Sequence, residues 1–259
     1  MPQLENYEVF LEKQVKSGKP RLKLEEAAAI REFFQGKATP AEAATRFTSD
    51  VTSATKRKGA EASLRTIWVL IENLGARFPE QHDKLIQLME AIIALPDMIL
   101  GSECIKMLTF SLTEGWDNTP TERINRVAFE AKLYKHDIFI TSYNGFSILS
   151  ETFEYSPSTP PQLDTASNRK LSVDIQLAEK WILNAGEKLF TCTDIYENCR
   201  FETAGGLWKG AKGFSRKRWA FWRQRASEIG SWKELGSETR EAAWAIVEVM
   251  ESIEGEAGW

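Results

Sequence analysis

The spacing of apolar residues constrains the fold more than any other feature, because they recur every three to four positions through most of the chain. Two such stripes lie in the first half: Leu64, Ile67, Ile71 and Leu74 in one, and Leu85, Leu88, Ile92 and Leu95 in the other. This spacing places apolar side chains on one face of an α-helix. Each stretch therefore predicts an amphipathic helix.

The second half of the chain carries longer stripes of the same kind. They consist of Leu171, Ile175, Ala178, Ile182, Ala185 and Leu189, and of Ala243, Val247, Met250 and Ile253. The last stripe follows Ser237, and we expect its helix to end at Gly255, a residue type that favours helix C-caps. Together the stripes predict an all-α multi-helix bundle of about 9–11 helices.

Two sites carry the signature of a helix start. Thr39-Pro40-Ala41-Glu42 and Thr119-Pro120-Thr121-Glu122 each combine a threonine cap, a proline in the first turn and a glutamate three residues after the cap. The threonine hydroxyl accepts a hydrogen bond from the glutamate amide, and the glutamate carboxylate can reach back to the cap amide. We expect helices to begin at both sites.

The stretch 137–149, DIFITSYNGFSIL, allows two interpretations. Its β-branched and aromatic residues surround Asn144-Gly145, a typical hairpin signal. A lone hairpin would have little support in a helical protein, so we favour an apolar helix interrupted near Gly145.

The length of 259 residues is compatible with one helical domain spanning residues 1–259. The stretch 155–168 is rich in proline and serine and predicts a long surface loop. A subdivision at this loop would give two helical subdomains.

Composition narrows the classes of function. The net charge of −4 argues against a protein whose whole surface binds nucleic acid or anionic lipid, so any polyanion site must be local. No apolar run approaches the roughly 20 residues that cross a bilayer, and the amino terminus lacks a secretory signal pattern. We therefore expect no membrane partner and a cytosolic location, with the nucleus as the alternative.

Cysteine and histidine usage argues against a disulfide framework or a metal centre. The three cysteines, Cys104, Cys192 and Cys199, contain no CxxC pair, and the chain has two histidines. Reduced thiols fit this pattern better than disulfides or structural zinc. We expect no metal and no cofactor.

The segment 205–225 is the best candidate for a binding site. Gly205, Gly206, Gly210 and Gly213 allow positive φ angles and a close approach of backbone amides to a bound group. Ser215 can then cap a helix whose first turn holds basic residues, where the helix dipole is already positive. A bound phosphate or carboxylate would relieve that repulsion.

The charge of this segment is entirely positive, because no acidic residue lies between Glu202 and Glu228. Its basic residues are Lys209, Lys212, Arg216, Lys217, Arg218, Arg223 and Arg225. One interpretation is a solvated cationic turn whose tryptophans are core and whose charges meet acidic helices; the other is ligand binding. The segment is not a Walker loop, because Ala211 follows Gly210, nor a dinucleotide fingerprint, because no strand precedes it.

Three residues are candidates for catalysis. His136 precedes Asp137, a neighbour that can raise a histidine pKa and orient its ring. Asp194 and Glu197 could place two carboxylates one turn apart, as acid and base or as metal ligands. The alternative is that all three are ordinary surface groups. We expect His82, the other histidine, to be exposed.

The tail of the chain resembles a family of helical proteins abundant in filamentous fungi and catalogued only as a domain of unknown function. The residues that carry the tail signature LWxG, GFS, RW and FW are Leu207, Trp208, Gly210, Gly213, Phe214, Ser215, Arg218, Trp219, Phe221 and Trp222. The likeness continues through residues 67–96 and 181–190. It implies a fungal, non-secreted protein of a kind that sometimes accompanies secondary-metabolite genes.

These observations lead to one main hypothesis for function. The chain is a small-molecule-binding protein of fungal secondary metabolism, with the character of a cofactor-independent cyclase or lyase. In this hypothesis Trp208, Trp219 and Trp222 form an aromatic wall that stabilises developing positive charge. An anionic small molecule is anchored by the basic side chains of Lys209, Lys212, Arg216 and Arg218.

Two alternatives belong to other classes. Seven basic residues interleaved with aromatic ones also suit RNA, so the chain could be an RNA-binding or aminoacyl-tRNA-dependent enzyme with tRNA as partner. It could also be a non-catalytic protein-interaction module in which the tryptophan-rich tail is core. The sequence does not define an oligomeric state.

Overall fold

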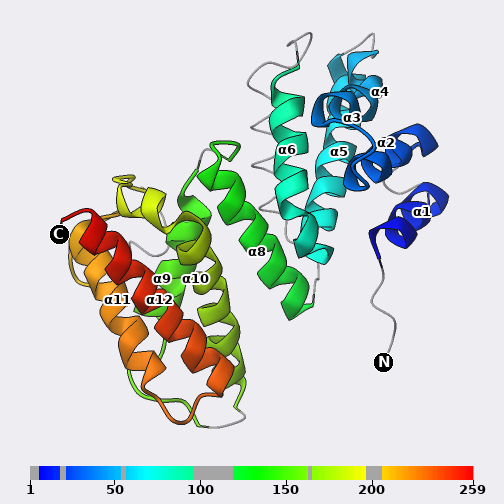
Figure 1. Cartoon of the computed structure of the whole chain (residues 1–259). Coiled ribbons are helices and arrows are strands. Elements are labelled where there is room, and N and C mark those ends of the chain that lie inside the picture. Colours follow the sequence, from blue (N-terminus) through cyan, green and yellow to red (C-terminus); the bar gives the residue numbers. More distant parts are fainter. Residues whose placement is uncertain are drawn as a thin grey trace. The chain divides into compact units, whose positions relative to one another are not determined.

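Helices make up the regular structure of the protein (Figure 1). The computed structural model describes residues 6–17, 22–53, 57–95, 119–139, 141–162, 165–196 and 206–258. These residues contain eleven α-helices, one short 3-10 helix and no strand, which confirms the all-α prediction. The chain divides into two compact units, Met1–Phe139 and Ile140–Trp259.

The first unit is built from seven α-helices among its described residues. They are α1 (Tyr7–Ser17), α2 (Leu24–Phe34), α3 (Pro40–Phe47), α4 (Ser49–Thr52), α5 (Arg57–Arg77), α6 (His82–Ile93) and α8 (Pro120–Lys135), with the 3-10 helix η1 at Pro79–Gln81. The main packing pairs are α2 with α3, α3 with α6, and α5 with α8. Trp68 and Phe129 are among the fully buried side chains of this core.

Both expected helix starts are confirmed. At Thr39 the hydroxyl accepts from the Glu42 amide and the Glu42 carboxylate accepts from the Thr39 amide. At Thr119 the hydroxyl accepts from the Glu122 amide at 3.2 Å, and the Glu122 carboxylate pairs with Arg77 at 3.3 Å.

The second unit is formed by four helices in the residues that the structure describes. They are α9 (Tyr143–Glu154), α10 (Ala166–Phe190), α11 (Arg216–Gly230) and α12 (Ser237–Glu256). α12 packs along α10 and α11, and α9 packs on both of these helices (Figure 1). The core between them includes Phe146, Trp181 and Trp222, each fully buried.

Two local predictions were wrong. Helix α9 runs without a break through Gly145, because a Cβ there would lie 2.9 Å from the Trp181 ring and glycine lets the two helices approach closely. The helix starts at Tyr143, after a turn in which Asp137 has a φ of 58°. Gly255 does not end α12, which continues to Glu256 with Ala257 as its C-cap.

The proline-rich loop lies inside the second unit. It connects α9 to α10, and these two helices pack against each other. The division between compact units therefore falls between residues 139 and 140 rather than at 155–168.

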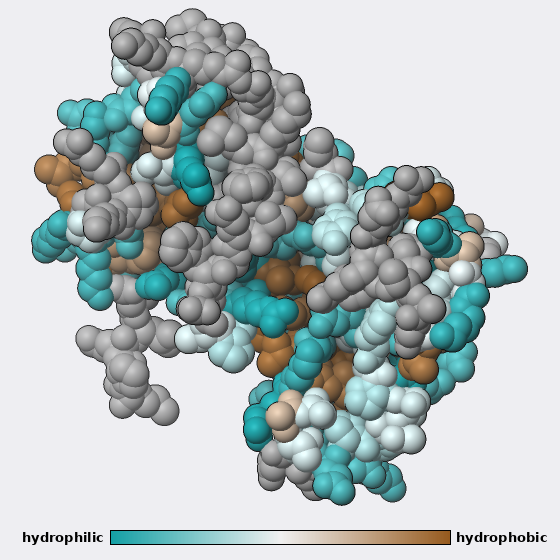
Figure 2. Space-filling model, turned by 180° about the vertical axis from the view of Figure 1, so that it is seen from behind, coloured by the Kyte–Doolittle hydropathy of each residue, from teal (hydrophilic) through white to brown (hydrophobic). Residues whose placement is uncertain are grey.

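On the face drawn in Figure 2, hydrophilic side chains in teal cover much of the surface and hydrophobic ones in brown form smaller patches. Among the helices in the described ranges, none combines the length and apolarity needed to cross a membrane.

Candidate functional site

The loop that precedes α11 has a tightly fixed backbone. Gly213 has a φ of 69°, and a Cβ at this position would lie 2.4 Å from the Asp194 carbonyl oxygen. The next residue, Phe214, donates its amide to that same carbonyl at 3.0 Å. Ser215 is the N-cap of α11, as expected, and its hydroxyl accepts from the Arg218 amide at 3.2 Å.

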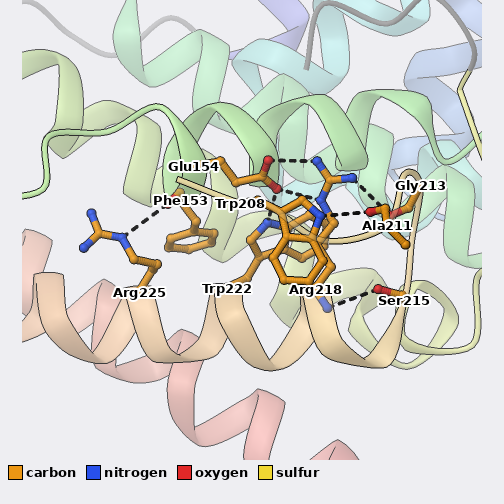
Figure 3. A network of polar contacts seen from close by, with 9 residues as sticks. All are labelled: Phe153, Glu154, Trp208, Ala211, Gly213, Ser215, Arg218, Trp222 and Arg225. Atoms are coloured by element: carbon orange, nitrogen blue, oxygen red, sulfur yellow. Dashed lines mark hydrogen bonds and ion pairs between the residues drawn. The ribbon is translucent and has the colours of Figure 1, made fainter. Parts of the chain in front are cut away.

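Arg218 is the centre of a buried polar network (Figure 3). Its Nε and Nη2 donate to the two carboxylate oxygens of Glu154 at 2.7 and 2.8 Å, and its Nη1 donates to the Gly213 carbonyl at 3.1 Å. Trp222 donates its indole N–H to Glu154 at 2.7 Å. Arg218 is 0% exposed and Glu154 is 2% exposed, so this bidentate pair is shielded from water and from any ligand.

Aromatic rings enclose the same guanidinium. The Arg218 Cζ atom lies 4.5 Å from the centroid of Phe146, 5.7 Å from that of Trp222 and 5.8 Å from that of Trp208. Trp208 comes from the glycine-rich loop, where its indole N–H donates to the Ala211 carbonyl at 2.9 Å. The loop is thereby closed over the ion pair, and cation–π attraction adds to its stability.

The C-terminal end of α9 is stabilised by a second arginine of α11. Arg225 donates to the Phe153 carbonyl at 3.3 Å (Figure 3). It also donates to the Pro157 carbonyl at 2.9 Å. The Glu154 carbonyl accepts from the Leu207 amide at 2.7 Å. The carbonyls of Phe153 and Glu154 belong to the last turn of α9, where carbonyl groups have no partner within the helix, so these two bonds satisfy acceptors at its negative end.

Four basic side chains of the segment remain on the surface. Arg218 and Arg225 are buried, and Arg223 pairs with Glu251 and Glu254, each at 3.0 Å. The others form what we call the basic quartet, and its members are Lys209, Lys212, Arg216 and Lys217. Within the described part of the chain no carboxylate forms an ion pair with any member of the quartet.

The quartet has local contacts of other kinds. Lys209 donates to the Gly206 carbonyl at 2.6 Å. The Arg216 guanidinium stacks on Phe190, with Cζ 3.4 Å from the ring centroid. Arg216 and Lys217 occupy the first turn of α11, where no acidic residue offsets their charge.

The structure separates the predicted ligand-binding residues into two groups. Lys209, Lys212 and Arg216 are exposed and Trp208 is half-buried. Arg218, Trp219 and Trp222 are 0%, 2% and 0% exposed, so they belong to the core instead of forming a wall that a ligand could contact.

Sequence reasoning missed Glu154, the acceptor that holds Arg218. A signal was present, because Glu154 continues the helical spacing of Phe146 and Ser150, two residues of α9 that are fully buried. A carboxylate in a buried stripe needs a cationic partner.

Asp194 belongs to a hydroxyl cluster. Its carboxylate accepts from the Ser142 hydroxyl at 2.5 Å and from the Tyr196 hydroxyl at 3.2 Å. Ser142 also contacts the Tyr196 hydroxyl and lies 3.4 Å from the Cys192 sulfur. The bond from Ser142 lowers the pKa of Asp194, and burial raises the pKa values of Tyr196 and Cys192. The cluster thus contains an ionised carboxylate and neutral donors, and it holds the 191–196 loop against the start of α9.

The histidines lie in the first unit. His136 is exposed and its Nδ1 lies 3.0 Å from the Glu90 carboxylate. The expectation that His82 is exposed was wrong, since it is 2% exposed and its Nε2 bonds to the Gly75 carbonyl at 2.7 Å. Burial lowers the pKa of His82 to about 4.

The structure describes two of the three catalytic candidates, and the predicted pairing of Asp194 with Glu197 stays a prediction. His136 lies in the first unit and Asp194 in the second. Glu197 lies outside the described residues, as do Cys104 and Cys199. In the described ranges no group of three or more His, Cys, Asp or Glu side chains is arranged to hold a metal ion.

Fold and site together define a class: an all-α protein whose C-terminal helices are joined by a buried arginine–glutamate pair beneath an exposed basic loop. The family model described as "Protein of unknown function (DUF3632)" matches residues 68–226, and the chain belongs to this family. The matched range contains Glu154, Arg218 and Trp222. Comparison with curated proteins gives no match, and neither does comparison with solved structures.

Proposed function

We propose that this protein binds an anionic ligand through the basic quartet. The observation that supports the proposal is the contrast within one segment. Arg218, Arg223 and Arg225 form ion pairs with carboxylates of the second unit, whereas the four side chains of the quartet are exposed and have no carboxylate partner among the described residues.

The position of two of these cations strengthens the argument. Arg216 and Lys217 follow the N-cap Ser215 directly, at the positive end of the α11 dipole. Cations are unfavourable there, and a bound anion would offset both the side-chain charge and the helix dipole. Lys217 thereby takes the anchoring role that the sequence had suggested for Arg218.

The enzymatic form of the proposal has less support. A cofactor-independent cyclase or lyase would need accessible aromatic faces beside the anion, and Trp219 and Trp222 are core residues. A place in fungal secondary metabolism and a cytosolic or nuclear location rest on the resemblance and the composition, and they are part of this proposal.

A binding measurement tests the quartet directly. Tripolyphosphate is titrated by calorimetry into the wild-type chain and into the quartet variant, Lys212→Ala/Arg216→Ala/Lys217→Ala, which removes three of the four cations, at constant ionic strength. The matched control is Lys37→Ala/Lys135→Ala/Lys233→Ala, which removes the same charge at exposed positions outside the segment. We expect at least a tenfold loss of affinity in the quartet variant and little change in the control. Equal affinities in all three proteins would refute the proposal.

RNA is the second candidate for the anionic ligand, favoured by the number of basic residues in the segment. Single-stranded RNA sites also use exposed rings for base stacking. Trp208 is half-buried against Phe221, with ring centroids 5.5 Å apart, so this requirement is poorly met. An electrophoretic shift assay with bulk tRNA at low salt tests this candidate.

A further inference from the structure

We infer that the anionic ligand is an acidic protein segment that also carries bulky aliphatic or aromatic side chains. Its carboxylates would contact the basic quartet, and its apolar side chains would contact Ile195 and Leu207. This inference rests on the proposed function and names the class of partner for the same surface.

Exposed apolar residues accompany the cations of the quartet. Ile195 is 61% exposed and Leu207 is 38% exposed. Ile195 lies against Gly213, since a Cβ on that glycine would be 2.9 Å from the Ile195 Cγ1 atom, and Lys212 is the preceding residue. Leu207 precedes Lys209 by two residues in the same loop. Each apolar side chain therefore has a cation of the quartet close by in the loop.

The backbone beneath both apolar residues is fixed. The Leu207 amide donates to the Glu154 carbonyl at 2.7 Å, and the carbonyl of Asp194, next to Ile195, accepts from the Phe214 amide at 3.0 Å. Glu154 is in turn held by the buried Arg218. A surface that is already ordered loses less conformational entropy when a partner docks.

The chemistry of this surface favours an acidic peptide over a nucleic acid. Ile195 and Leu207 are aliphatic and offer no face on which a base can stack. Trp208, a ring of the same loop, has its indole N–H bonded to Ala211 and its face near Arg218. Aliphatic side chains beside lysines complement a peptide in which acidic and apolar residues alternate, because both charge and apolar area are matched.

The test uses two short labelled peptides and the full chain. One peptide alternates aspartate or glutamate with leucine or phenylalanine; the other replaces the apolar residues with serine at the same charge. Fluorescence anisotropy measures their affinities for the wild type, for Ile195→Ser/Leu207→Ser, and for the quartet variant. Leu183→Ser is the control, because Leu183 is 45% exposed on α10, away from this loop in the sequence.

We expect the apolar–acidic peptide to bind the wild type and the control alike. Ile195→Ser/Leu207→Ser should weaken it about tenfold, because burial of two aliphatic side chains is lost. The same variant should bind tripolyphosphate as well as the wild type, whereas the quartet variant should lose both ligands.

Other outcomes would overturn either the inference about the peptide alone or the proposed anion binding as well. Equal affinity for both peptides, or tRNA binding that Ile195→Ser/Leu207→Ser does not weaken, would indicate a general polyanion site and overturn the inference alone. Tripolyphosphate binding without peptide binding has the same meaning. Failure of the wild type to bind tripolyphosphate and both peptides would overturn the proposed function as well.

Discussion

At the scale of single residues, the buried Arg218–Glu154 pair joins α11 to α9 in the second unit. Both partners are almost completely buried, and the two bonds between them satisfy both carboxylate oxygens. A buried ion pair adds little net stability compared with a well-packed apolar pair, but loss of one partner leaves an isolated charge in the core. We therefore expect the pair to fix how α11 packs on α9.

Truncation of this carboxylate tests that view. Glu154→Ala should lower the free energy of unfolding by about 3–5 kcal/mol, because Arg218 is left buried without its counter-ion. The measurement is urea unfolding followed by the fluorescence of the tryptophans. The matched control is Glu251→Ala, which removes the exposed partner of Arg223 and should cost at most about 1 kcal/mol. Similar losses in both variants would contradict the role given to the pair.

Gly213 carries the second prediction at this scale. Gly213→Ala places a Cβ where only 2.4 Å separates it from the Asp194 carbonyl oxygen, at a φ of 69° that alanine rarely adopts. We expect the free energy of unfolding to fall by about 1–3 kcal/mol. In Gly255→Ala the new Cβ meets nothing within 4 Å and lies in a helix, so that protein should be as stable as the wild type or slightly more stable. Urea midpoints distinguish the two variants, and an unaffected Gly213→Ala would show that the loop adjusts freely.

At the scale of elements, α11 begins at the N-cap Ser215, which was predicted from the sequence. Ser215→Ala removes the hydroxyl that accepts from the Arg218 amide and should cost about 1 kcal/mol. The control, Ser252→Ala, lies on an exposed turn of α12, where alanine is the better helix former. In chemical denaturation, the midpoint of Ser215→Ala should fall below that of the wild type, whereas the midpoint of Ser252→Ala should stay the same or rise. A Ser215→Ala protein as stable as the control would mean that the cap contributes nothing.

The elements themselves could largely be predicted because their signals are local. The predicted stripes through Ile71, Leu88, Ile182 and Val247 lie in helices of the structure, except that Leu95 follows the end of α6. The caps at Thr39, Thr119 and Ser215 are present. Helix α9 was harder to predict from the sequence, because Gly145 lies inside the helix where it packs closely against Trp181, a residue thirty-six positions away. Local sequence patterns do not predict contacts between residues that are distant in the chain.

The candidate site was predictable only in part for the same reason. Sequence indicated a basic segment, and Lys209, Lys212 and Arg216 are indeed exposed. It could not show that Arg218 turns inward, because its partner Glu154 is 64 residues away and belongs to another helix. Charge spacing identifies a cationic helix face but not the element that meets it.

At the scale of the whole molecule, the two compact units have separate cores. Trp68 and Phe129 are buried in the first, and Trp181 and Trp222 in the second. A unit with its own core can lose its structure in its own transition. A destabilising substitution in one unit should therefore lower the stability of that unit and leave the stability of the other unchanged.

His82 makes this expectation testable through pH. Burial lowers its pKa to about 4 in the folded protein, against an ordinary value of 6.5. Between these values the unfolded state binds more protons than the folded state, so the free energy of unfolding of the first unit rises with pH across this window and levels off above it. The shift corresponds to about 3 kcal/mol. His82→Gln keeps a donor for the Gly75 carbonyl and removes the titration, so it should flatten this dependence.

Hydrogen exchange followed by mass spectrometry can assign each effect to its unit. Lowering the pH from 6.5 towards 4 should reduce the protection factors of amides in α5, α6 and α8, after correction for the intrinsic pH dependence of exchange, and His82→Gln should suppress that loss. Glu154→Ala should instead expose amides of α9, α10 and α11 at every pH, because it strands the Arg218 charge in their core. Equal loss of protection across both sets of helices, either on acidification of the wild type or in Glu154→Ala, would show that the chain unfolds as one cooperative unit and that the two cores are not energetically separate.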